Sequence, residues 1–373
     1  MSWTRSEDLT GVDDEQAAFL GAVDAALHGA VAEGISDRLT VIDQGLIPFA
    51  ELALSAATVG GKRLRPRFAY WAWRSAAGDT EPTVQIVSLG AALELLHAAI
   101  LVHDDIIDRS VLRRGRPSVR AGLAAGHRAT GWTGSADDFG DHTALLIGDL
   151  LWGVAHDLFD TAVDGLDPGQ RRLIFGAFRG MRAEVISGQL LELRAQAAGD
   201  FSTSAAEKIL QYKTSVYTVE RPMELGLRVG GATRSTVLER FARATGQAFQ
   251  LRDDLSDLFA APMNSGKRVG DDIRSAKPTE LLGSALRLAG AADRATLIGI
   301  VGDPDASADE IDTVKTVFVE SGAVAAITAR IGVLVAEARR ALAELRDDTV
   351  GAAVRSALED LLQECTELSF MAP

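Results

Sequence analysis

Two acidic stretches of the chain have the residue types and the spacing to do chemistry. Each places three aspartates at positions i, i+1 and i+4: Asp104, Asp105 and Asp108 in the first, and Asp253, Asp254 and Asp257 in the second. Carboxylates this close repel one another by about 4 kcal/mol per pair at 4 Å when the effective dielectric constant is near 20. A bound cation must offset this repulsion. Because the ligands would all be hard oxygen atoms, the stretches favour Mg²⁺ over zinc or copper.

A third stretch has similar spacing but a different setting. Asp137, Asp138 and Asp141 lie among glycines, and no apolar helical segment leads into them. We therefore predict that this stretch is a loop that does not bind metal.

Three basic stretches that contain glycine could complement an anion. The first is GGKRLRP from Gly60, the second is VLRRGRP from Val111, and the third runs from Gly266 to Thr279. Glycines let backbone amides approach an anion, and nearby cations can converge on it. Two plainer alternatives remain open. The first stretch could be a solvated basic turn, and the arginines of the second could form a salt-bridge network with the aspartates before them.

Helical periodicity predicts the elements that must position these residues. Leu89, Leu93, Leu96 and Ile100 recur at three- and four-residue steps, which indicates a helix with one buried face that ends near Asp108. His97 faces the same way as Asp104 on this helix, either as a core residue or as part of the site. Further helices are predicted at about residues 14–31, 47–57, 143–158, 171–198, 201–228 with a kink at Pro222, 235–257, 324–343 and 350–367.

The composition favours an all-α fold. Hydrophobic residues make up 47% of the 373 residues, and proline occupies only 10 positions. We predict a flexible N-terminal tail over residues 1–12 and a single helical bundle with a central cavity over residues 13–373. Residues 118–142 are rich in glycine, and we predict an irregular segment there that could cover the site.

The net charge and the cysteine content argue against several classes of protein. A charge of −14 argues against a general nucleic-acid or anionic-membrane surface. Cys365 is the only cysteine, so an internal disulfide bond and a thiolate zinc cluster are ruled out. We see no signal peptide and no apolar run of the roughly 20 residues that span a bilayer. We therefore expect a soluble cytoplasmic protein without nucleic-acid binding or stable membrane insertion.

Taken together, these motifs resemble those of the trans-isoprenyl diphosphate synthases, the polyprenyl synthetase family. The resemblance extends from about Gly60 to Thr279 and includes, in order, GGKRLRP, LHAAILVHDDIIDRSVLRRGRP, GQLLEL, YKT, GQAFQLRDDLSD and GKRVGDDIRSAKPT. It implies the all-helical isoprenoid synthase fold, head-to-tail condensation of isopentenyl diphosphate with an allylic diphosphate, three Mg²⁺ ions per active site and a homodimer.

The resemblance also implies a role for each matched residue. The six aspartates of the two acidic motifs would bind the metal ions on either side of the allylic diphosphate. The implied ligands of isopentenyl diphosphate are Lys62, Arg65, His97 and Arg114, and those of the allylic diphosphate are Arg113, Lys213 and Lys267. Thr214 and Gln250 match positions that face the developing carbocation. Lys277 would also bind substrate, although Ala276 stands where the family often has glycine.

Product length in this family depends on the residues that close the substrate tunnel just before the first acidic motif. Here these are Ala99 and Ile100, with Leu96 one helical turn further and Trp152 on the neighbouring helix. An aromatic ring at this floor would end the product early, whereas Ala99 leaves room. We predict geranylgeranyl diphosphate (C20), with farnesyl diphosphate or products of C25 and above as alternatives.

Two rival functions agree less well with the sequence. A class I terpene cyclase shares the fold and the first motif but usually has an Asn/Ser/Glu-type second motif. A catalytically silent synthase subunit normally loses one aspartate triad, and this chain has both.

Overall fold

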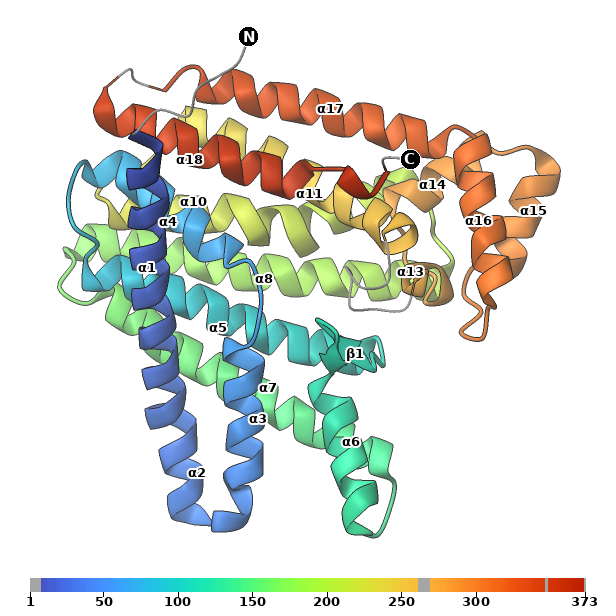
Figure 1. Ribbon diagram of the computed structural model, residues 1–373, viewed down its shortest axis with the longest axis horizontal. Coiled ribbons are helices and arrows are strands. Elements are labelled where there is room, and N and C mark those ends of the chain that lie inside the picture. The colour runs from blue at the N-terminus through green and yellow to red at the C-terminus, as the bar shows by residue number, and fades with distance from the viewer. Residues whose placement is uncertain (1–7, 261–268, 346–347, 372–373) are drawn as a thin grey trace. The chain divides into compact units, whose positions relative to one another are not determined.

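The computed structural model describes residues 8–260, 269–345 and 348–371, which are almost entirely helical (Figure 1). Contacts group them into two compact units. The first contains the described residues up to Ile174 together with Pro222–Arg234 and Asp348–Ala357, and the second contains Phe175–Arg221, the described part of 235–347 and the residues from Leu358 onward. Because the chain alternates between the units, neither is one continuous stretch of sequence. The single-domain assignment stays a prediction.

The first unit contains the whole of the long helix that bears the first acidic motif. Its elements are α1 (Asp8–Val31), a π-helical turn (Ala32–Ser36), α2 (Asp37–Ile42), a 3-10 turn (Gln44–Leu46), α3 (Ile47–Thr58), α4 (Leu64–Ala77), α5 (Val84–Ile107), α6 (Val119–Thr130), α7 (Ala136–Val163), most of α10 (Arg221–Val229) and the beginnings of α8 (Pro168–Ala198) and α18 (Thr349–Thr366). Between α5 and α6, β1 (Leu112–Arg113) pairs antiparallel with β2 (Arg116–Pro117).

The second unit contains the helix that bears the second acidic motif. Its elements are the remainder of α8 and α18, α9 (Thr203–Ile209), the π-helix η3 (Leu210–Glu220), α11 (Thr236–Phe259), α13 (Asp271–Arg274), α14 (Glu280–Leu288), α15 (Ala291–Ile300), α16 (Ala308–Glu320), α17 (Ala323–Leu342) and a 3-10 turn (Ser369–Met371). The helix predicted at 201–228 is thus three elements, and the new helix begins at Arg221, next to the expected kink at Pro222.

Aromatic side chains of α1 and α4 form the centre of the first unit. Phe19 stacks on Tyr70 with ring centroids 4.3 Å apart, and Tyr70 stacks on Trp73 at 5.6 Å. All three side chains are buried. Glu15 binds both the Tyr70 hydroxyl and, at 2.7 Å, the Nε atom of Arg74. The start of α1 is therefore held against α4 by rings and by a part-buried ion pair.

The end of α5 is held by α7. A Cβ atom at Gly148 would lie 2.3 Å from Nε2 of His103, so the imidazole occupies the space that a larger residue would need. The same nitrogen lies 3.3 Å from the carbonyl oxygen of Leu145 and 3.4 Å from the carboxylate of Asp149. Because His103 directly precedes the first acidic motif, this contact fixes where the motif lies relative to α7.

Two regions that we predicted to be irregular are helical. Residues 8–12, which we assigned to the tail, belong to α1, and residues 1–7 lie outside the described residues. Within residues 118–142, α6 and the first turns of α7 account for most of the segment, so the prediction of a loop at Asp137–Asp141 was also wrong.

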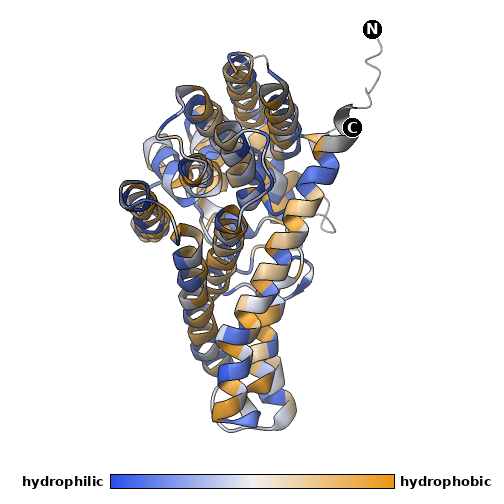
Figure 2. Cartoon of the chain, turned by 90° about the vertical axis from the view of Figure 1, so that its left-hand side faces the viewer, coloured by the Kyte–Doolittle hydropathy of each residue, from blue (hydrophilic) through white to orange (hydrophobic). Residues whose placement is uncertain are grey.

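Two helical segments are long and apolar enough to cross a membrane, contrary to our prediction from the sequence. By length and composition alone, Val12–Ile42 and Val84–Ile107 could each cross a membrane, and α16 with α17 would qualify only as a broken span bent by 62°. Of the apolar window in Val84–Ile107, 72% is buried inside the protein, as expected for a core helix. In Val12–Ile42 the buried share is 28%, and Figure 2 shows hydrophobic residues along this segment.

Candidate active site

The first acidic motif lies at the C-terminal end of α5. Asp105 is buried at 2% exposure, Asp104 and Asp108 are half-buried, and Asp108 caps the helix with its backbone N–H bonded to the Asp104 carbonyl oxygen at 2.8 Å. The triad therefore stands at the negative end of the helix dipole, which disfavours three further negative charges. The predicted need for a cation at this helix end is thus reinforced.

Arg113 meets part of this need. Its Nε atom donates to Asp105 Oδ1 at 2.9 Å, and its Nη2 atom lies 2.5 Å from Asp105 Oδ1 and 3.2 Å from Asp104 Oδ2. The β1–β2 hairpin directs the arginine back to the helix end, because Arg114 and Gly115 both have positive φ and make a tight two-residue turn. The salt-bridge alternative is therefore present in the structure, and a guanidinium with five donors can still bind an anion.

The first two basic stretches meet in space. The Nη1 atom of Arg114 donates to the carbonyl oxygen of Val59 at 2.8 Å. Gly61 has φ of 96°, which favours glycine, and a Cβ atom there would lie 2.9 Å from Nη2 of Arg114, so the guanidinium rests close to the backbone. Lys62 is exposed beside this contact, whereas Arg65 is buried. The basic stretch at Gly60 is thus part of a built cluster, and the solvated-turn alternative is not supported.

His97 belongs to the same cluster. Burial lowers the pKa of its imidazole well below the ordinary value, and the positive charges of Arg65, Arg114, Arg113 and Arg63 lower it further. His97 is therefore neutral at pH 7 and can donate one hydrogen bond and accept another. Among the residues predicted to bind isopentenyl diphosphate, the first unit brings Arg65, His97 and Arg114 together.

Arg63 supports this cluster, a role that we did not predict. The residue has φ of 50°, and its guanidinium lies 3.0 Å from the carboxylates of both Glu94 and Asp24. Glu94 is 4% exposed and precedes His97 by one turn of α5. These ion pairs fasten the basic turn to α1 and α5. The only sequence signal for this contact was a glutamate, Glu94, within a segment predicted to be an apolar helix.

The second acidic motif ends α11 in the second unit. Asp253 is exposed, Asp254 is 7% exposed, and Asp257 accepts a hydrogen bond from the backbone N–H of Asp272 at 3.3 Å. The Gln250 amide donates to Asp254 Oδ1 at 2.7 Å, so part of its hydrogen-bonding capacity serves the motif rather than a carbocation.

Asp272 is a fourth carboxylate at this motif. Burial raises the pKa of Asp254 well above its ordinary value, and the charge of Asp272 raises it further, while the hydrogen bond from Gln250 lowers it. Lys277 lies 3.5 Å from Asp272 and is therefore part of the cluster. The preceding Ala276 has φ of 51°, a backbone conformation that favours glycine. Asp272 stands in the quoted GKRVGDDIRSAKPT motif, which could have pointed to it.

Lys213 and Thr214 lie on η3. The Lys213 ammonium is 2.6 Å from the carboxylate of Glu192 on α8, so this lysine is held in an ion pair between the two elements. Thr214 is half-buried. Lys267 lies outside the described residues.

The three predicted chain-length residues lie on α5. Leu96 and Ala99 are fully buried, and Ile100 is half-buried. Trp152 on α7 is half-buried, with its ring 6.1 Å from that of His156.

The third aspartate stretch is neutralised by arginines. Asp137 lies 2.7 Å from Arg128, and Asp141 binds Arg120. The absence of a metal-binding role stays a prediction, although these carboxylates already have cationic partners.

The acidic clusters suit a metal ion that is shared with a substrate. Within the part of the chain that the structure describes, no three His, Cys, Asp or Glu side chains converge into a closed metal site. Magnesium commonly binds through one or two carboxylates plus substrate phosphates, so open clusters of oxygen ligands fit it. The raised pKa of Asp254 also fits, because a nearby cation would relieve the cost of its buried charge.

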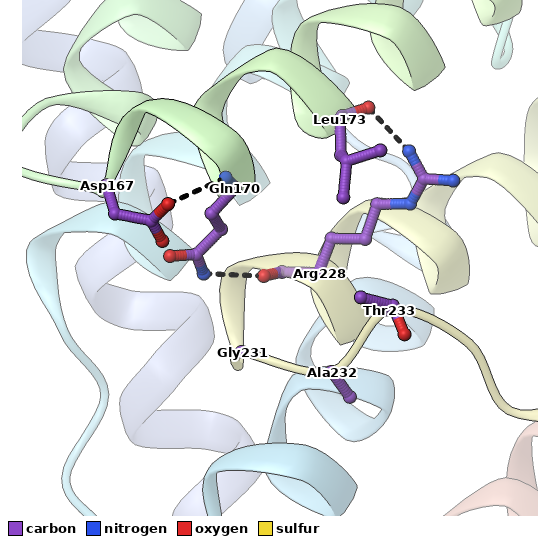
Figure 3. A pocket seen from close by; sticks show the side chains of 7 residues that line it. All are labelled: Asp167, Gln170, Leu173, Arg228, Gly231, Ala232 and Thr233. Carbon is purple, nitrogen blue, oxygen red and sulfur yellow. Dashed lines mark hydrogen bonds between the residues drawn. The ribbon is translucent and has the colours of Figure 1, made fainter.

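A separate pocket of about 280 Å³ contains none of the predicted site residues. It is lined in the first unit by Asp167, Gln170, Leu173, Arg228 and the loop Gly231–Thr233 (Figure 3). Figure 3 shows that its polar groups bind one another: Gln170 donates to the Arg228 carbonyl oxygen at 2.7 Å, and Arg228 donates to that of Leu173 at 2.5 Å. The Gln170 amide and the Nη1 atom of Arg228 are therefore already hydrogen-bonded within the protein.

Known proteins are similar to this chain over most of its length. The family model of Polyprenyl synthetase matches residues 49–318. A nonaprenyl diphosphate synthase of Mycobacterium tuberculosis is 31% identical over 342 residues, which cover 91% of this chain and 92% of that protein. A geranylgeranyl pyrophosphate synthase from Corynebacterium glutamicum, crystallised with isoprenyl diphosphate and magnesium, has a TM-score of 0.86 and 31% identity, covering 94% of this chain and 98% of that one.

A further solved structure is similar over nearly the whole chain. A polyprenyl synthase from Caulobacter crescentus CB15, complexed with calcium and isoprenyl diphosphate, has a TM-score of 0.74 and 26% identity, with 95% and 97% of the two chains covered. Fold and sequence together define a prenyltransferase that acts on isoprenyl diphosphates. The chain belongs to the polyprenyl synthetase family, which confirms the resemblance and the all-α fold.

Proposed function

We propose that this enzyme condenses isopentenyl diphosphate head to tail with allylic diphosphates in a Mg²⁺-dependent reaction, and that geranylgeranyl diphosphate is its main product. One observation carries the proposal: basic side chains lie at ion-pair distance from a carboxylate of the first acidic helix end and from a carboxylate beside the second. Arg113 lies 2.5 Å from Asp105, and Lys277 lies 3.5 Å from Asp272 beside Asp254. Metal-bound diphosphate needs both kinds of partner.

The residues of the first unit would divide the work between two anions. Arg65, Arg114 and the exposed Lys62 would bind isopentenyl diphosphate, with neutral His97 as a hydrogen-bonding partner. Arg113 and the aspartates beside it would bind the allylic diphosphate and its metal ions. Bound Mg²⁺ would neutralise the charge that develops on the leaving diphosphate. The protein would then accelerate the reaction by orientation and electrostatics, with the released diphosphate as the proton acceptor.

Residues of the second unit would supply further metal and diphosphate ligands. Asp253, Asp254 and Asp257 would bind further metal ions, three in all, while Lys213, Lys267 and Lys277 would bind the diphosphate. The oxygen dipoles of Thr214 and Gln250 would stabilise the carbocation. The hydrogen bond from the Gln250 amide nitrogen to Asp254 is compatible with this role because the amide oxygen still accepts.

Geranylgeranyl diphosphate is proposed because Ala99, one of the two floor residues just before the first motif, is small. Ala99 is fully buried on α5, and Leu96 lies below it. The magnesium-bound relative at 31% identity is a geranylgeranyl pyrophosphate synthase, whereas the relative of equal identity from Mycobacterium tuberculosis makes a nonaprenyl product by name. Longer products and farnesyl diphosphate therefore remain the alternatives within this proposal.

The test is incubation of the protein and Mg²⁺ with labelled isopentenyl diphosphate and, separately, dimethylallyl, geranyl and farnesyl diphosphates, followed by sizing of the products. We expect a C20 alcohol after dephosphorylation. Ala99→Phe should shorten the wild-type product, because an aromatic ring would fill the floor. An unchanged product would refute the floor assignment, and no incorporation of isopentenyl units would favour a cyclase or a silent subunit.

We also propose that the enzyme works in the cytoplasm as a homodimer. Leu145 and Leu146 on α7 are 48% and 62% exposed, and adjacent exposed leucines are a feature of helices that pack against a partner. Light scattering after gel filtration should give twice the chain mass of 39.5 kDa. A mass equal to one chain at micromolar concentration would contradict the dimer.

A further inference from the structure

The GQLLEL segment of α8 contains a buried carboxylate without an assigned role. Glu192 is 5% exposed. Its Oε1 atom lies 2.6 Å from Nζ of Lys213 and accepts a hydrogen bond from Nε2 of Gln189 at 3.3 Å. A carboxylate is buried this deeply only where an ion pair and hydrogen bonds offset its lost hydration. The Lys213 side chain keeps an exposed fraction of 21%, so a dissolved reagent or substrate can reach it.

The backbone of Lys213 is fixed by the same helix. A Cβ atom at Gly188 would lie 2.3 Å from the Lys213 nitrogen and 2.6 Å from its Cα atom, so α8 and η3 touch backbone to backbone. The π-helical η3 is itself an uncommon geometry that often occurs at functional sites. Helix α8 thus fixes both the main chain of Lys213, through Gly188, and its ammonium group, through Glu192.

We propose that Glu192 is a positioning residue, which orients Lys213 toward the diphosphate of the allylic substrate. This inference rests on the proposed function. A lysine has a flexible four-carbon stem and three donors on its ammonium group. An ion pair with a buried carboxylate restricts the stem and so limits the directions in which the ammonium group can point.

Glu192 has two opposing effects on a diphosphate. Its negative charge repels the anion, whereas the orientation of Lys213 attracts it. Affinity in the ground state reflects both effects and is therefore a poor test. The rate of the chemical step depends on whether the ammonium stands where charge develops on the leaving group. The informative quantities are kcat and the chemical reactivity of Lys213.

The same helix offers a matched control. Glu184, earlier on α8, lies 2.8 Å from Nε and 2.5 Å from Nη2 of Arg221 at the start of α10. Glu184→Gln therefore breaks a glutamate ion pair between α8 and the segment that follows η3, without touching Lys213. A merely structural role for Glu192 predicts that both substitutions act alike.

The first readout is the rate at which acetic anhydride acetylates Lys213, measured by mass spectrometry on the full chain. The nitrogen must leave its ion pair with Glu192 before it can attack the anhydride, so loss of this partner should speed the reaction. We expect Glu192→Gln to react at least threefold faster than the wild type, Glu192→Asp to be intermediate, and Glu184→Gln to be unchanged. Equal rates in Glu192→Gln and the wild type would overturn the proposal.

The second readout is kcat of condensation in a double-mutant cycle. In the wild-type background, Glu192→Gln should lower kcat about tenfold. In the Lys213→Ala background, the same substitution should lower kcat less than twofold, because no ammonium is left to orient. Full additivity, or an equal loss in Glu184→Gln, would overturn the positioning role while the proposed function stands. A wild type that forms no product at all would instead overturn the proposed function. Glu192→Asp keeps the cycle usable if Glu192→Gln does not fold.

Discussion

Glu280, at the first position of α14, is a buried carboxylate with an incomplete set of partners. It is 3% exposed, and its Oε2 atom lies 2.6 Å from Nη1 of Arg330. Its Oε1 atom has no hydrogen-bond partner among the described residues. Burial raises its pKa from 4.5 to about 6, although the charge of Arg330 lowers it. The folded protein therefore binds this proton more tightly than the unfolded chain does.

This shift predicts a pH-dependent loss of stability. Ionising a buried carboxyl group whose folded pKa is raised destabilises the folded protein, whereas the protonated group carries no such penalty. The free energy of unfolding should therefore fall as the pH rises from about 4.5 to about 6 and then level off. The loss is about 2 kcal/mol. Glu280→Gln should remove this fall when urea denaturation is followed across the pH range. Glu344→Gln, in an exposed pair with Arg240, should leave the pH profile unchanged. Parallel profiles for the wild type and Glu280→Gln would refute the assignment.

At the residue scale, the sequence shows the chemically active groups but not the residues that hold them. The aspartates and the basic turns repeat at fixed local spacing, so both clusters could be predicted. The partners that orient them are distant along the chain: Glu192 is separated from Lys213 by 21 positions and Glu94 from Arg63 by 31. No periodic pattern reports an ion pair of this kind, because it depends on how helices pack.

Gly226 on α10 shows how close two helices can come in the first unit. A Cβ atom there would lie 1.9 Å from the carbonyl oxygen of Ala69 and 2.6 Å from its carbonyl carbon, both on α4. Backbone atoms cannot give way as a flexible side chain can. Gly226→Ala should therefore destabilise the protein by about 3 kcal/mol in urea denaturation.

An exposed glycine provides the control for this prediction. Gly332 lies inside α17, is exposed, and has no atom within 4 Å of a built Cβ. Gly332→Ala should stabilise the protein by about 0.5–1 kcal/mol through backbone entropy alone. If Gly226→Ala were as stable as Gly332→Ala, the close contact between α4 and α10 would be wrong.

At the element scale, long helices with an apolar face were predictable, whereas α6 was not. Ser118 and Ser135 accept hydrogen bonds from backbone N–H groups of the first turns of α6 and α7, and these caps were available in the sequence. The glycines of residues 118–142 led us to predict an irregular segment where the chain is helical. A Cβ atom at Gly140 would lie 2.5 Å from the Arg120 carbonyl oxygen, so this glycine permits close helix packing rather than an irregular backbone.

The π-helix η3 could not be predicted from periodicity. Its residues have an ordinary amphipathic pattern, and we expected one helix over 201–228. The π-helical geometry instead accompanies close backbone contacts. Gly188 packs against Lys213, and a Cβ atom at Gly246 of α11 would lie 3.0 Å from backbone atoms of Ser215. Such contacts exist only once α8 and α11 are packed around η3.

At the scale of the whole molecule, the class of enzyme follows from motifs, but the product does not. Relatives of equal identity, 31%, carry the names of a nonaprenyl and a geranylgeranyl synthase. Product length depends on a few side chains at the tunnel floor, such as Ala99, and overall similarity is insensitive to them. The fold and the two clusters were therefore within reach of sequence reasoning, whereas chain length needs a measurement.

The most direct test of the central claim is the rate of condensation in three single variants. Asp104→Asn and Asp253→Asn each remove one charge from an acidic helix end, and we expect kcat to fall about 10²–10³-fold in both. Asp137→Asn changes the third aspartate stretch, where an exposed ion pair with Arg128 is lost, and should leave kcat within twofold of the wild type. If Asp104→Asn or Asp253→Asn retained wild-type activity while folded, the claim that both acidic helix ends carry the chemistry would be contradicted.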